Sequence, residues 1–342
     1  MKVLEIHGAT GDSTILIGES LGDLRKYISA EEVVIITDTN VRSYYLKDFL
    51  SYEVIEIGTG EKVKNLDTVQ AIYGKLVELE ADRSSFIVGI GGGIVCDIAG
   101  FVASTYVRGV RFGFVPSTLL SQVDASVGGK NGVNLGGYKN MVGVFNQPEF
   151  VICDMNLLRT LPDREISCGF AEIVKHAAIG DADLFSYLEA HHEKALELDT
   201  EVIERLVYDS LIIKSSIVNR DEKEEGERRK LNFGHTFGHA IESTTGVSHG
   251  EAVSAGMLVA SALSKKRGYL PPEDAGRIEE LLEKLKLPTR LQLDGARVLD
   301  ALRKDKKRKR ESINFVFLHG IGNAVVEEIS IRELEALVNE II

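Results

Sequence analysis

Three of the eight histidines of this chain fall in one short stretch, Leu231–Glu251, which reads LNFGHTFGHAIESTTGVSHGE. His235 and His239 are four residues apart, a spacing that puts both imidazoles on one face of a helix. His249 follows after a Ser/Thr/Gly interruption. Neutral imidazoles at one point, completed by a carboxylate, are typical ligands of a zinc-type cation. The pattern predicts a metal centre and leaves open which two histidines bind.

A carboxylate that could complete such a centre lies in GFAEIVKHA, Gly169–Ala177. Glu172 and Lys175 are three residues apart and share a helix face, so a surface ion pair is the alternative interpretation. The rest of this segment is almost wholly apolar, which indicates a buried helix. Charges on a buried helix are usually paired or bound to a metal. Glu172 is therefore the candidate third ligand.

A glycine triplet, Gly91–Gly93, stands between a predicted buried strand, SSFIVGI, and a predicted helix that contains Asp97. Backbone N–H groups at such a turn, together with the helix dipole, form an anion site suited to a pyrophosphate. The GxGxxG fingerprint is not met, because Cys96 stands where a glycine is required. A purely structural tight turn remains the alternative.

Basic side chains in glycine-rich surroundings form another candidate group. Lys130, Lys139 and Asn140 lie among glycines, where a lysine can approach phosphate or carboxylate oxygens closely. Each lysine taken alone is typical of a solvated surface. A substrate that carries both phosphate and carboxylate would need several basic residues, and Arg108, Lys214 and Arg228 are further candidates.

Two kinds of structure must position these residues. Predicted strands and helices alternate up to about residue 160, which favours a wound, mostly parallel sheet. In it, Asp38-Thr39-Asn40 ends a buried strand, at the edge where open α/β sheets bind ligands. Beyond Pro162 the pattern predicts helices, a late hairpin INFVFLHGIGNAVVEEI and a final helix from Ile331. The helices are expected at residues 165–179, 182–196, 200–219, 235–244, 251–267 and 272–285.

The overall composition excludes several classes of protein. The 342 residues allow two domains, and the net charge of −12 argues against a general nucleic-acid binder. No apolar run approaches the length of a membrane span, and no signal-peptide core is present at the start. Three widely spaced cysteines indicate reduced thiols and a cytoplasmic location.

Taken in order, the motifs of this chain resemble the 3-dehydroquinate synthase family of the sugar-phosphate cyclase superfamily. The resemblance covers almost the whole chain and rests on GGGIVCDIAGFVASTYVRG, VPSTLLSQVDASVGGKNGVN, YKNMVGVFNQP, LLRTLPDRE, GFAEIVKHA, LNFGHTFGHAIE, SHGEAV and DKKRKR. It implies a Rossmann-like, NAD-binding α/β domain at residues 1–160, an all-α metal- and substrate-binding domain at 161–342, and an active site in the cleft between them. Two departures, Asn131 for a common Thr and LGGYKN for PLGKN, keep the lysines.

The resemblance also implies the roles of particular residues. One divalent metal, zinc or cobalt, would be held by Glu172, His235 and His249, so that His239 belongs to the substrate environment. The NAD contacts would be Asp38, Asn40, Glu61, Lys64, Gly92, Gly93, Asp97, Ser117, Thr118, Lys139 and Thr160. The substrate contacts would be Arg108, Asp124, Lys130, Asn140, Lys175, Lys214, Arg228, Asn232, His239 and either Lys306 or Lys307, of which Lys130, Lys175, Lys214, Arg228, Asn232 and His239 would be catalytic.

The chemistry that the resemblance implies is a lyase reaction of the shikimate pathway, carried out by a cytoplasmic homodimer. The substrate would be 3-deoxy-D-arabino-heptulosonate 7-phosphate, oxidised transiently by NAD, cleaved by β-elimination of phosphate, reduced again and closed by an aldol step. The substrate's own phosphate would act as base. The rivals are a sister cyclase with another sugar phosphate, a metal-dependent polyol or alcohol dehydrogenase, and a non-catalytic metabolite-binding protein.

Overall fold

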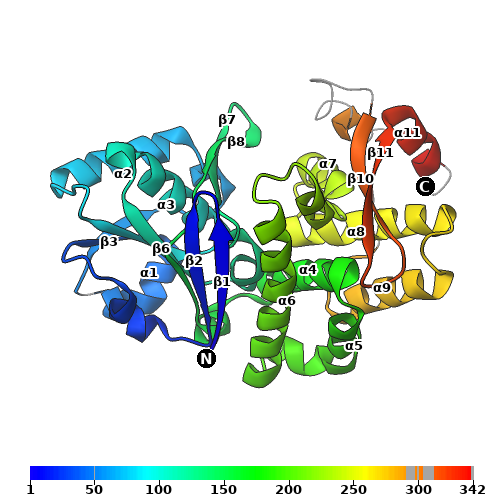
Figure 1. The fold of residues 1–342 in the computed structure, drawn as a ribbon, viewed down its shortest axis with the longest axis horizontal. Coiled ribbons are helices and arrows are strands. Elements are labelled where there is room, and N and C mark those ends of the chain that lie inside the picture. Colours follow the sequence, from blue (N-terminus) through cyan, green and yellow to red (C-terminus); the bar gives the residue numbers. More distant parts are fainter. Residues whose placement is uncertain (50, 290–296, 299, 303–311, 340–342) are drawn as a thin grey trace. The chain divides into compact units, whose positions relative to one another are not determined.

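The computed structural model describes residues 1–49, 51–289, 297–298, 300–302 and 312–339. The chain divides into two compact units, Met1–Pro162 and Asp163–Ile342. The first unit is an α/β layer structure and the second is mostly helical (Figure 1). Each unit is built around its own buried centre, a sheet in the first and a helix in the second.

Within the described residues, one sheet of seven strands forms the centre of the first unit, in the order β1-β2-β9-β6-β5-β3-β4. Only the β1–β2 pair is antiparallel; the other neighbours are parallel, as buried apolar strands joined by helices predict. The strands are β1 (Lys2–Gly8), β2 (Gly11–Ile17), β3 (Val33–Asp38), β4 (Glu53–Ile57), β5 (Phe86–Gly91), β6 (Arg111–Pro116) and β9 (Phe150–Cys153).

Helices and a separate hairpin complete the first unit. They are α1 (Thr39–Tyr45), α2 (Leu66–Glu78), α3 (Gly93–Thr105) and the hairpin of β7 (Lys130–Leu135) with β8 (Tyr138–Phe145), together with short turns at Leu21–Tyr27, Leu46–Phe49, Glu61–Val63, Tyr106–Arg108, Ser121–Ala125 and Met155–Thr160. The apolar core lies against the sheet, where the rings of Phe86 and Phe150 stack with centroids 5.7 Å apart. Some of the candidate NAD residues stand at the strand ends of this sheet: Asp38 ends β3, Gly92 follows β5 and Ser117 follows β6.

The second unit is organised around α4 (Asp163–Gly180), whose residues from Ile166 to Ile179 are all buried. This helix packs against α5, α6, α8 and α9. The unit comprises α5 (Ala182–Leu196), α6 (Thr200–Arg220), a turn at Glu227–Asn232, α7 (His235–Thr245), α8 (His249–Lys266), α9 (Pro272–Lys284), β10 (Ser312–Leu318), β11 (Ala324–Ser330) and α11 (Ile331–Asn339). It is therefore not entirely helical, since the predicted late hairpin forms a two-stranded antiparallel ribbon.

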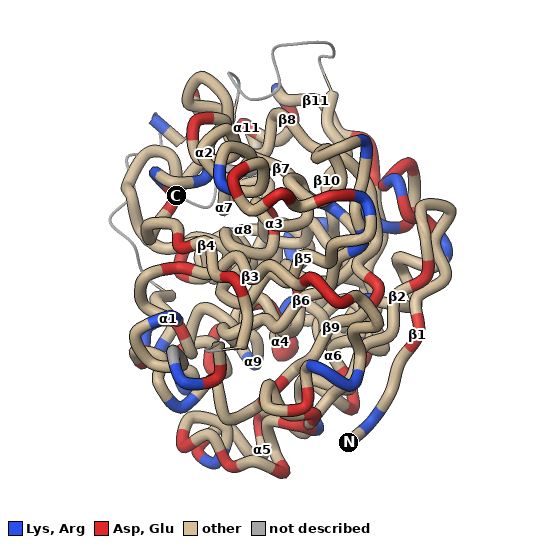
Figure 2. The backbone as a smooth tube through the Cα atoms, turned by 90° about the vertical axis from the view of Figure 1, so that its left-hand side faces the viewer, with Lys and Arg blue, Asp and Glu red and all other residues tan. Residues whose placement is uncertain are grey.

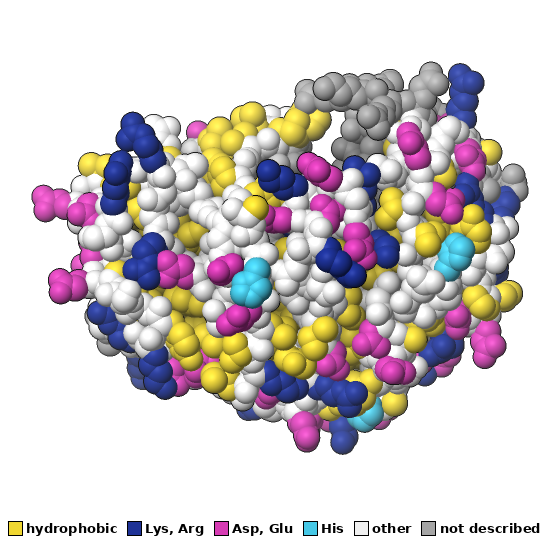
Figure 3. All heavy atoms as spheres, in the orientation of Figure 1, with side chains coloured by type: hydrophobic (Ala, Val, Ile, Leu, Met, Phe, Trp, Pro, Cys, Tyr) yellow, Lys and Arg dark blue, Asp and Glu magenta, His cyan; other side chains and the backbone are white. Residues whose placement is uncertain are grey.

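The acidic net charge is not gathered into one region of the chain. Acidic and basic positions are interspersed along the backbone (Figure 2), and side chains of both signs are mixed on the face seen in Figure 3. No helix in the described part of the chain combines the length and the hydropathy that crossing a bilayer requires.

Candidate active site

Helix α4 buries two opposite charges side by side. Glu172 is 0% and Lys175 1% exposed, and Lys175 Nζ contacts Glu172 Oε2 one turn away. Because an unpaired charge in an apolar interior is costly, each of these groups depends on its neighbour. The next residue, His176, is also fully buried, with its Nδ1 2.6 Å from Ser210 Oγ on α6. The few polar side chains of α4 are thus buried among its apolar residues.

The two histidines that meet Glu172 are the first residues of their helices. His235 begins α7 and His249 begins α8, whose N-terminus is closed by a capping box of Ser248 and Glu251. Gly250 lets α8 approach α4, because a Cβ at this position would lie 2.3 Å from the Cα of Cys168. This close packing holds His249 beside Glu172.

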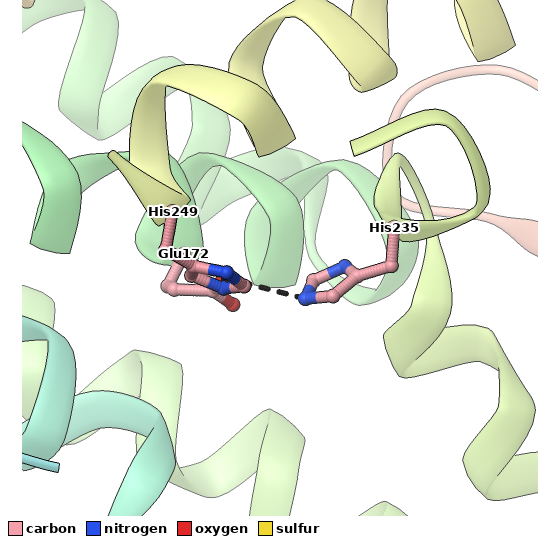
Figure 4. A group of neighbouring side chains, drawn as sticks. All are labelled: Glu172, His235 and His249. Carbon is pink, nitrogen blue, oxygen red and sulfur yellow. Dashed lines mark ion pairs between the residues drawn. The ribbon is translucent and has the colours of Figure 1, made fainter. Parts of the chain in front are cut away.

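Glu172, His235 and His249 converge from three helices (Figure 4), and each offers one ligand atom within 4.8 Å of the others. Glu172 Oε1 lies 3.6 Å from His235 Nε2 and 3.3 Å from His249 Nε2. Two imidazoles and a carboxylate are a donor set that zinc and cobalt accept, with room for substrate or water at the remaining positions. His239 lies outside this set, on an exposed position of α7 with its ring centroid 5.5 Å from that of His235.

The same surroundings shift the pKa values of His235 and His249 in opposite directions. Burial, followed by the nearby Lys175 ammonium, lowers the pKa of His235 to about 3, which keeps this imidazole neutral and able to bind a cation. Burial also acts to lower the pKa of His249, but hydrogen bonds to Glu172 and Glu242 outweigh it and raise the pKa to about 9. Glu172 and Glu242 thus favour a positive charge beside them, at the point where Glu172, His235 and His249 meet.

Glu242 is a member of this group that the sequence analysis did not single out. Its Oε2 lies 3.6 Å from Nδ1 of His249, which directs the other ring nitrogen of His249 to Glu172. A carboxylate behind a metal-binding histidine is a common device that fixes the ring. Its spacing was the available signal, because His235, His239 and Glu242 stand at i, i+4 and i+7 on one helix face.

The remaining candidate substrate residues of the second unit lie in and after α6. Lys214 on α6 and Arg228 in the following turn are buried, at 4% and 3% exposure. Arg228 Nη1 donates to the carbonyl of Glu222, and Asn232 Nδ2 donates to Glu224 Oε1. These buried cations can bind a substrate anion by charge-assisted hydrogen bonds.

Asp221, which the sequence analysis also missed, shapes the loop before Arg228. Its two carboxylate oxygens accept the backbone N–H groups of Glu225, Gly226 and Arg228 at 2.9, 2.8 and 2.9 Å. Burial acts to raise the pKa of Asp221, but these hydrogen bonds prevail and lower it. No periodic pattern marks this residue, because its partners lie in an irregular loop.

In the first unit, several candidate residues are held together by a network around Lys64. Its buried Nζ contacts Asp97 Oδ2 on α3 and donates to Asn140 Oδ1 at 2.6 Å. Burial raises the pKa of Asp97, an effect that Lys64 opposes. Glu61 lies three residues earlier, with Oε1 4.0 Å from Lys139 Nζ. The structure thus gathers residues from three separated sequence segments.

The other candidate NAD residues stand at strand ends and helix starts. Asp38 Oδ1 accepts the N–H groups of Asn40 and Val41 at 2.9 and 3.0 Å, which caps α1. Gly93 begins α3 next to Gly92, and a Cβ on Gly93 would lie 2.9 Å from that of Ala125. The remaining three residues are also hydrogen-bonded. The backbone N–H of Ser117 donates to the Gly91 carbonyl, Thr118 Oγ1 lies 2.8 Å from Ser121 Oγ, and Thr160 Oγ1 lies 3.0 Å from the Tyr45 hydroxyl.

Three further substrate candidates belong to the first unit. Arg108 is exposed and has a left-handed backbone, with φ 71°. Asp124 is half-buried in the Ser121–Ala125 turn, and Lys130 is exposed at the start of β7. Lys306 and its alternative, Lys307, lie outside the described residues.

Comparison with known proteins identifies the family. Residues 54–168 match the model of the 3-dehydroquinate synthase N-terminal region, and residues 169–308 match the model of its C-terminal region. A 3-dehydroquinate synthase of Dehalococcoides mccartyi is 42% identical, over 97% of both chains.

Two solved structures match this chain over nearly its whole length. ValA, a 2-epi-5-epi-valiolone synthase from Streptomyces hygroscopicus solved with NAD⁺ and Zn²⁺ bound, has a TM-score of 0.88 at 27% identity over 99% of each chain. A 2-deoxy-scyllo-inosose synthase complexed with carbaglucose-6-phosphate, NAD⁺ and Co²⁺ has a TM-score of 0.85 at 25% identity, also over 99% of each chain. With both family models matched, this chain belongs to the 3-dehydroquinate synthase family.

Proposed function

We propose that this chain is a 3-dehydroquinate synthase, which converts 3-deoxy-D-arabino-heptulosonate 7-phosphate to 3-dehydroquinate and phosphate. The observation that carries the proposal is the convergence of Glu172, His235 and His249 in a chain 42% identical to a 3-dehydroquinate synthase. The sister cyclases among the solved structures are less similar, at 25% and 27% identity.

A divalent cation, zinc or cobalt, would be held by Glu172 Oε1 and by the Nε2 atoms of the two histidines, where it would polarise a substrate oxygen. NAD would supply the hydride acceptor and donor, with its contacts on the segments around Asp38, Lys64 and Gly92. We further propose that residues 1–160 carry the cofactor contacts and residues 161–342 the metal and most of the substrate contacts. The protein's own part is positioning and charge stabilisation.

The substrate carboxylate is the feature that would separate this enzyme from its sister cyclases. Arg228 and Lys214 are buried cations, and Asn232 adds an amide donor in the same part of the second unit. A substrate carboxylate buried beside Arg228 and Lys214 would have its charge paired by these cations. An uncharged substrate end could not form such ion pairs. This matching of charge favours the heptulosonate phosphate over sedoheptulose 7-phosphate.

The location and assembly are also proposals. We infer a cytoplasmic homodimer, supported by the free, buried thiols of Cys96, Cys153 and Cys168 for the location and by the resemblance for the dimer. Light scattering after size exclusion tests the assembly.

The proposed activity is tested by identifying the product by NMR after incubation with heptulosonate phosphate, NAD⁺ and zinc. The expected result is stoichiometric 3-dehydroquinate and phosphate, with Glu172→Gln as the inactive control. Faster turnover of sedoheptulose 7-phosphate would favour a sister cyclase. An oxidised sugar that retains its phosphate would indicate a dehydrogenase.

A further inference from the structure

Asn134, near the end of β7, connects three separate points of the first unit. Its backbone N–H donates to the carbonyl of Lys64 at 2.9 Å, and its side-chain Nδ2 donates to Glu61 Oε1 at 2.7 Å. Its side-chain Oδ1 accepts the backbone N–H of Asn140, on β8, at 2.8 Å. One side chain therefore joins the Glu61–Lys64 segment to the β7–β8 hairpin.

The contact with Asn140 closes a ring of interactions. Asn140 has a left-handed backbone, with φ 52°, which is unusual for a residue other than glycine. Its N–H is held by Asn134 and its Oδ1 by Lys64 Nζ, at 2.8 and 2.6 Å, while Asn134 itself binds the backbone of Lys64. Asn134 and Lys64 together fix the backbone and the side chain of Asn140. The side-chain Nδ2 of Asn140 is then the donor that can bind a substrate oxygen.

The surroundings of Asn134 are more open than those of Lys64. The side chain of Lys64 is 7% exposed, whereas the side chains of Glu61 and Lys139 are 44% and 48% exposed. Without Asn134, the exposed Glu61 would have little to hold it in one rotamer. The hydrogen bond from Asn134 to this carboxylate is charge-assisted and therefore stronger than a neutral one.

We propose that Asn134 is a positioning residue that couples the cofactor-contacting segment, Glu61–Lys64, to the substrate-contacting residue Asn140. The inference rests on the proposed function, which assigns Glu61 and Lys64 to NAD and Asn140 to the substrate. Asn134 contacts neither ligand in this account. Its loss weakens the binding of both, because the two segments then have to be ordered separately when the ligands bind.

The first test measures NAD dissociation constants and steady-state kinetics of Asn134→Ala. Loss of both side-chain hydrogen bonds should raise the NAD Kd and the substrate KM about tenfold each and change kcat less than about threefold. Asn314→Ala, an exposed asparagine on β10 in the other unit, is the matched control and should leave Kd and KM as in the wild type. Unchanged Kd and KM in Asn134→Ala, or a loss confined to kcat, would overturn the proposal.

A second test reverses the hydrogen bond between Asn134 and Glu61, so that residue 61 donates and residue 134 accepts. Asn134→Asp retains an oxygen for the Asn140 N–H but places a second carboxylate against Glu61. In the Glu61→Gln background the new glutamine amide can donate to that carboxylate. Asn134→Asp should raise the NAD Kd about tenfold when Glu61 is present and about twofold or less when Gln replaces it. An equal increase in both backgrounds would show that the two side chains are not coupled and would overturn the inference.

Failure of this inference is distinguishable from failure of the proposed function. A wild-type protein that does not convert heptulosonate phosphate contradicts the proposed function, whatever the Asn134 variants do. A wild-type protein that forms 3-dehydroquinate, with an Asn134→Ala variant of normal Kd and KM, retains the function and refutes the coupling. Unfolding midpoints of all variants establish that each is folded under the assay conditions.

Discussion

The two units hold their charged candidate residues in different ways. In the second unit Glu172, Lys175, Lys214 and Arg228 are all at most 4% exposed, and the first three lie on the long helices α4 and α6. In the first unit the candidate charges are more varied: Lys64 is buried beside Asp97 on α3, whereas the side chains of Glu61, on a short turn, and Lys139, on the hairpin, are nearly half exposed.

The difference in burial between these charges indicates how each unit can contribute to catalysis. Charges buried on packed helices are held rigidly, which suits groups that must meet a metal and a reacting carbon with fixed geometry. Partly exposed charges on turns are accessible to a ligand from solvent, which suits the binding of a long cofactor. Removing a buried charge of the second unit should therefore cost far more than removing the exposed charge of Lys139 in the first.

The largest expected effect follows from removing one partner of a buried ion pair. Lys175→Met leaves Glu172 without the ammonium beside it, and breaking a buried pair in this way costs roughly 3–5 kcal/mol. The free energy of unfolding in urea, measured on metal-free protein, checks this value. Lys139→Met, at an exposed position of the first unit, should change it by about 0.5 kcal/mol or less. Equal losses in the two variants would abolish the distinction between the units.

The next effect distinguishes His249, the first residue of α8, from His239 on α7. His249→Ala should lose more metal affinity than the ~10–100-fold that the loss of an outer-shell partner costs, because a ligand itself is removed. His239→Ala should retain its metal, since His239 lies outside the cluster. Metal content after dialysis against a weak chelator measures both. Retention in His249→Ala with loss in His239→Ala would show that the wrong pair had been assigned.

Substrate binding should follow the same contrast. Arg228→Ala should lower kcat/KM on the order of 10²-fold, because the substrate carboxylate would be buried without its guanidinium partner. Metal content and the NAD Kd should stay normal. Lys139→Ala should lower kcat/KM by about tenfold at most, since its ammonium is exposed and screened. Wild-type kinetics for Arg228→Ala would contradict the assignment of the carboxylate site.

The smallest effect concerns the loop that carries Arg228. Burial acts to raise the pKa of Asp221, but the backbone hydrogen bonds that it accepts prevail and hold the pKa below the ordinary aspartate value, so the unfolded state binds the proton more readily. The stabilisation is therefore complete above that value and is lost as the pH falls through the lower, folded pKa. Asp221→Asn should cost about 1 kcal/mol at pH 7 and less near pH 3, measured by urea unfolding. A cost that grows as the pH falls would have the wrong sign.

The sequence predicted regular elements more fully than it predicted the site. The second helix of the second unit was predicted at 182–196, and α5 spans those residues, because a continuous apolar periodicity marks it. Spacing could not choose between the three histidines, since a helix-face argument favours His235 with His239, while the pair at Glu172 comes from two helices. Asp221 and Asn134 escaped notice because their partners are backbone groups and side chains that only the folded loops bring near.

The most direct test of the proposed reaction follows phosphate release and NADH absorbance together after heptulosonate phosphate is added. We predict that phosphate accumulates to the level of the substrate while no net NADH accumulates, because the bound NADH formed in each cycle is oxidised again in the same cycle. NADH rising in step with substrate consumed, without release of phosphate, would contradict it.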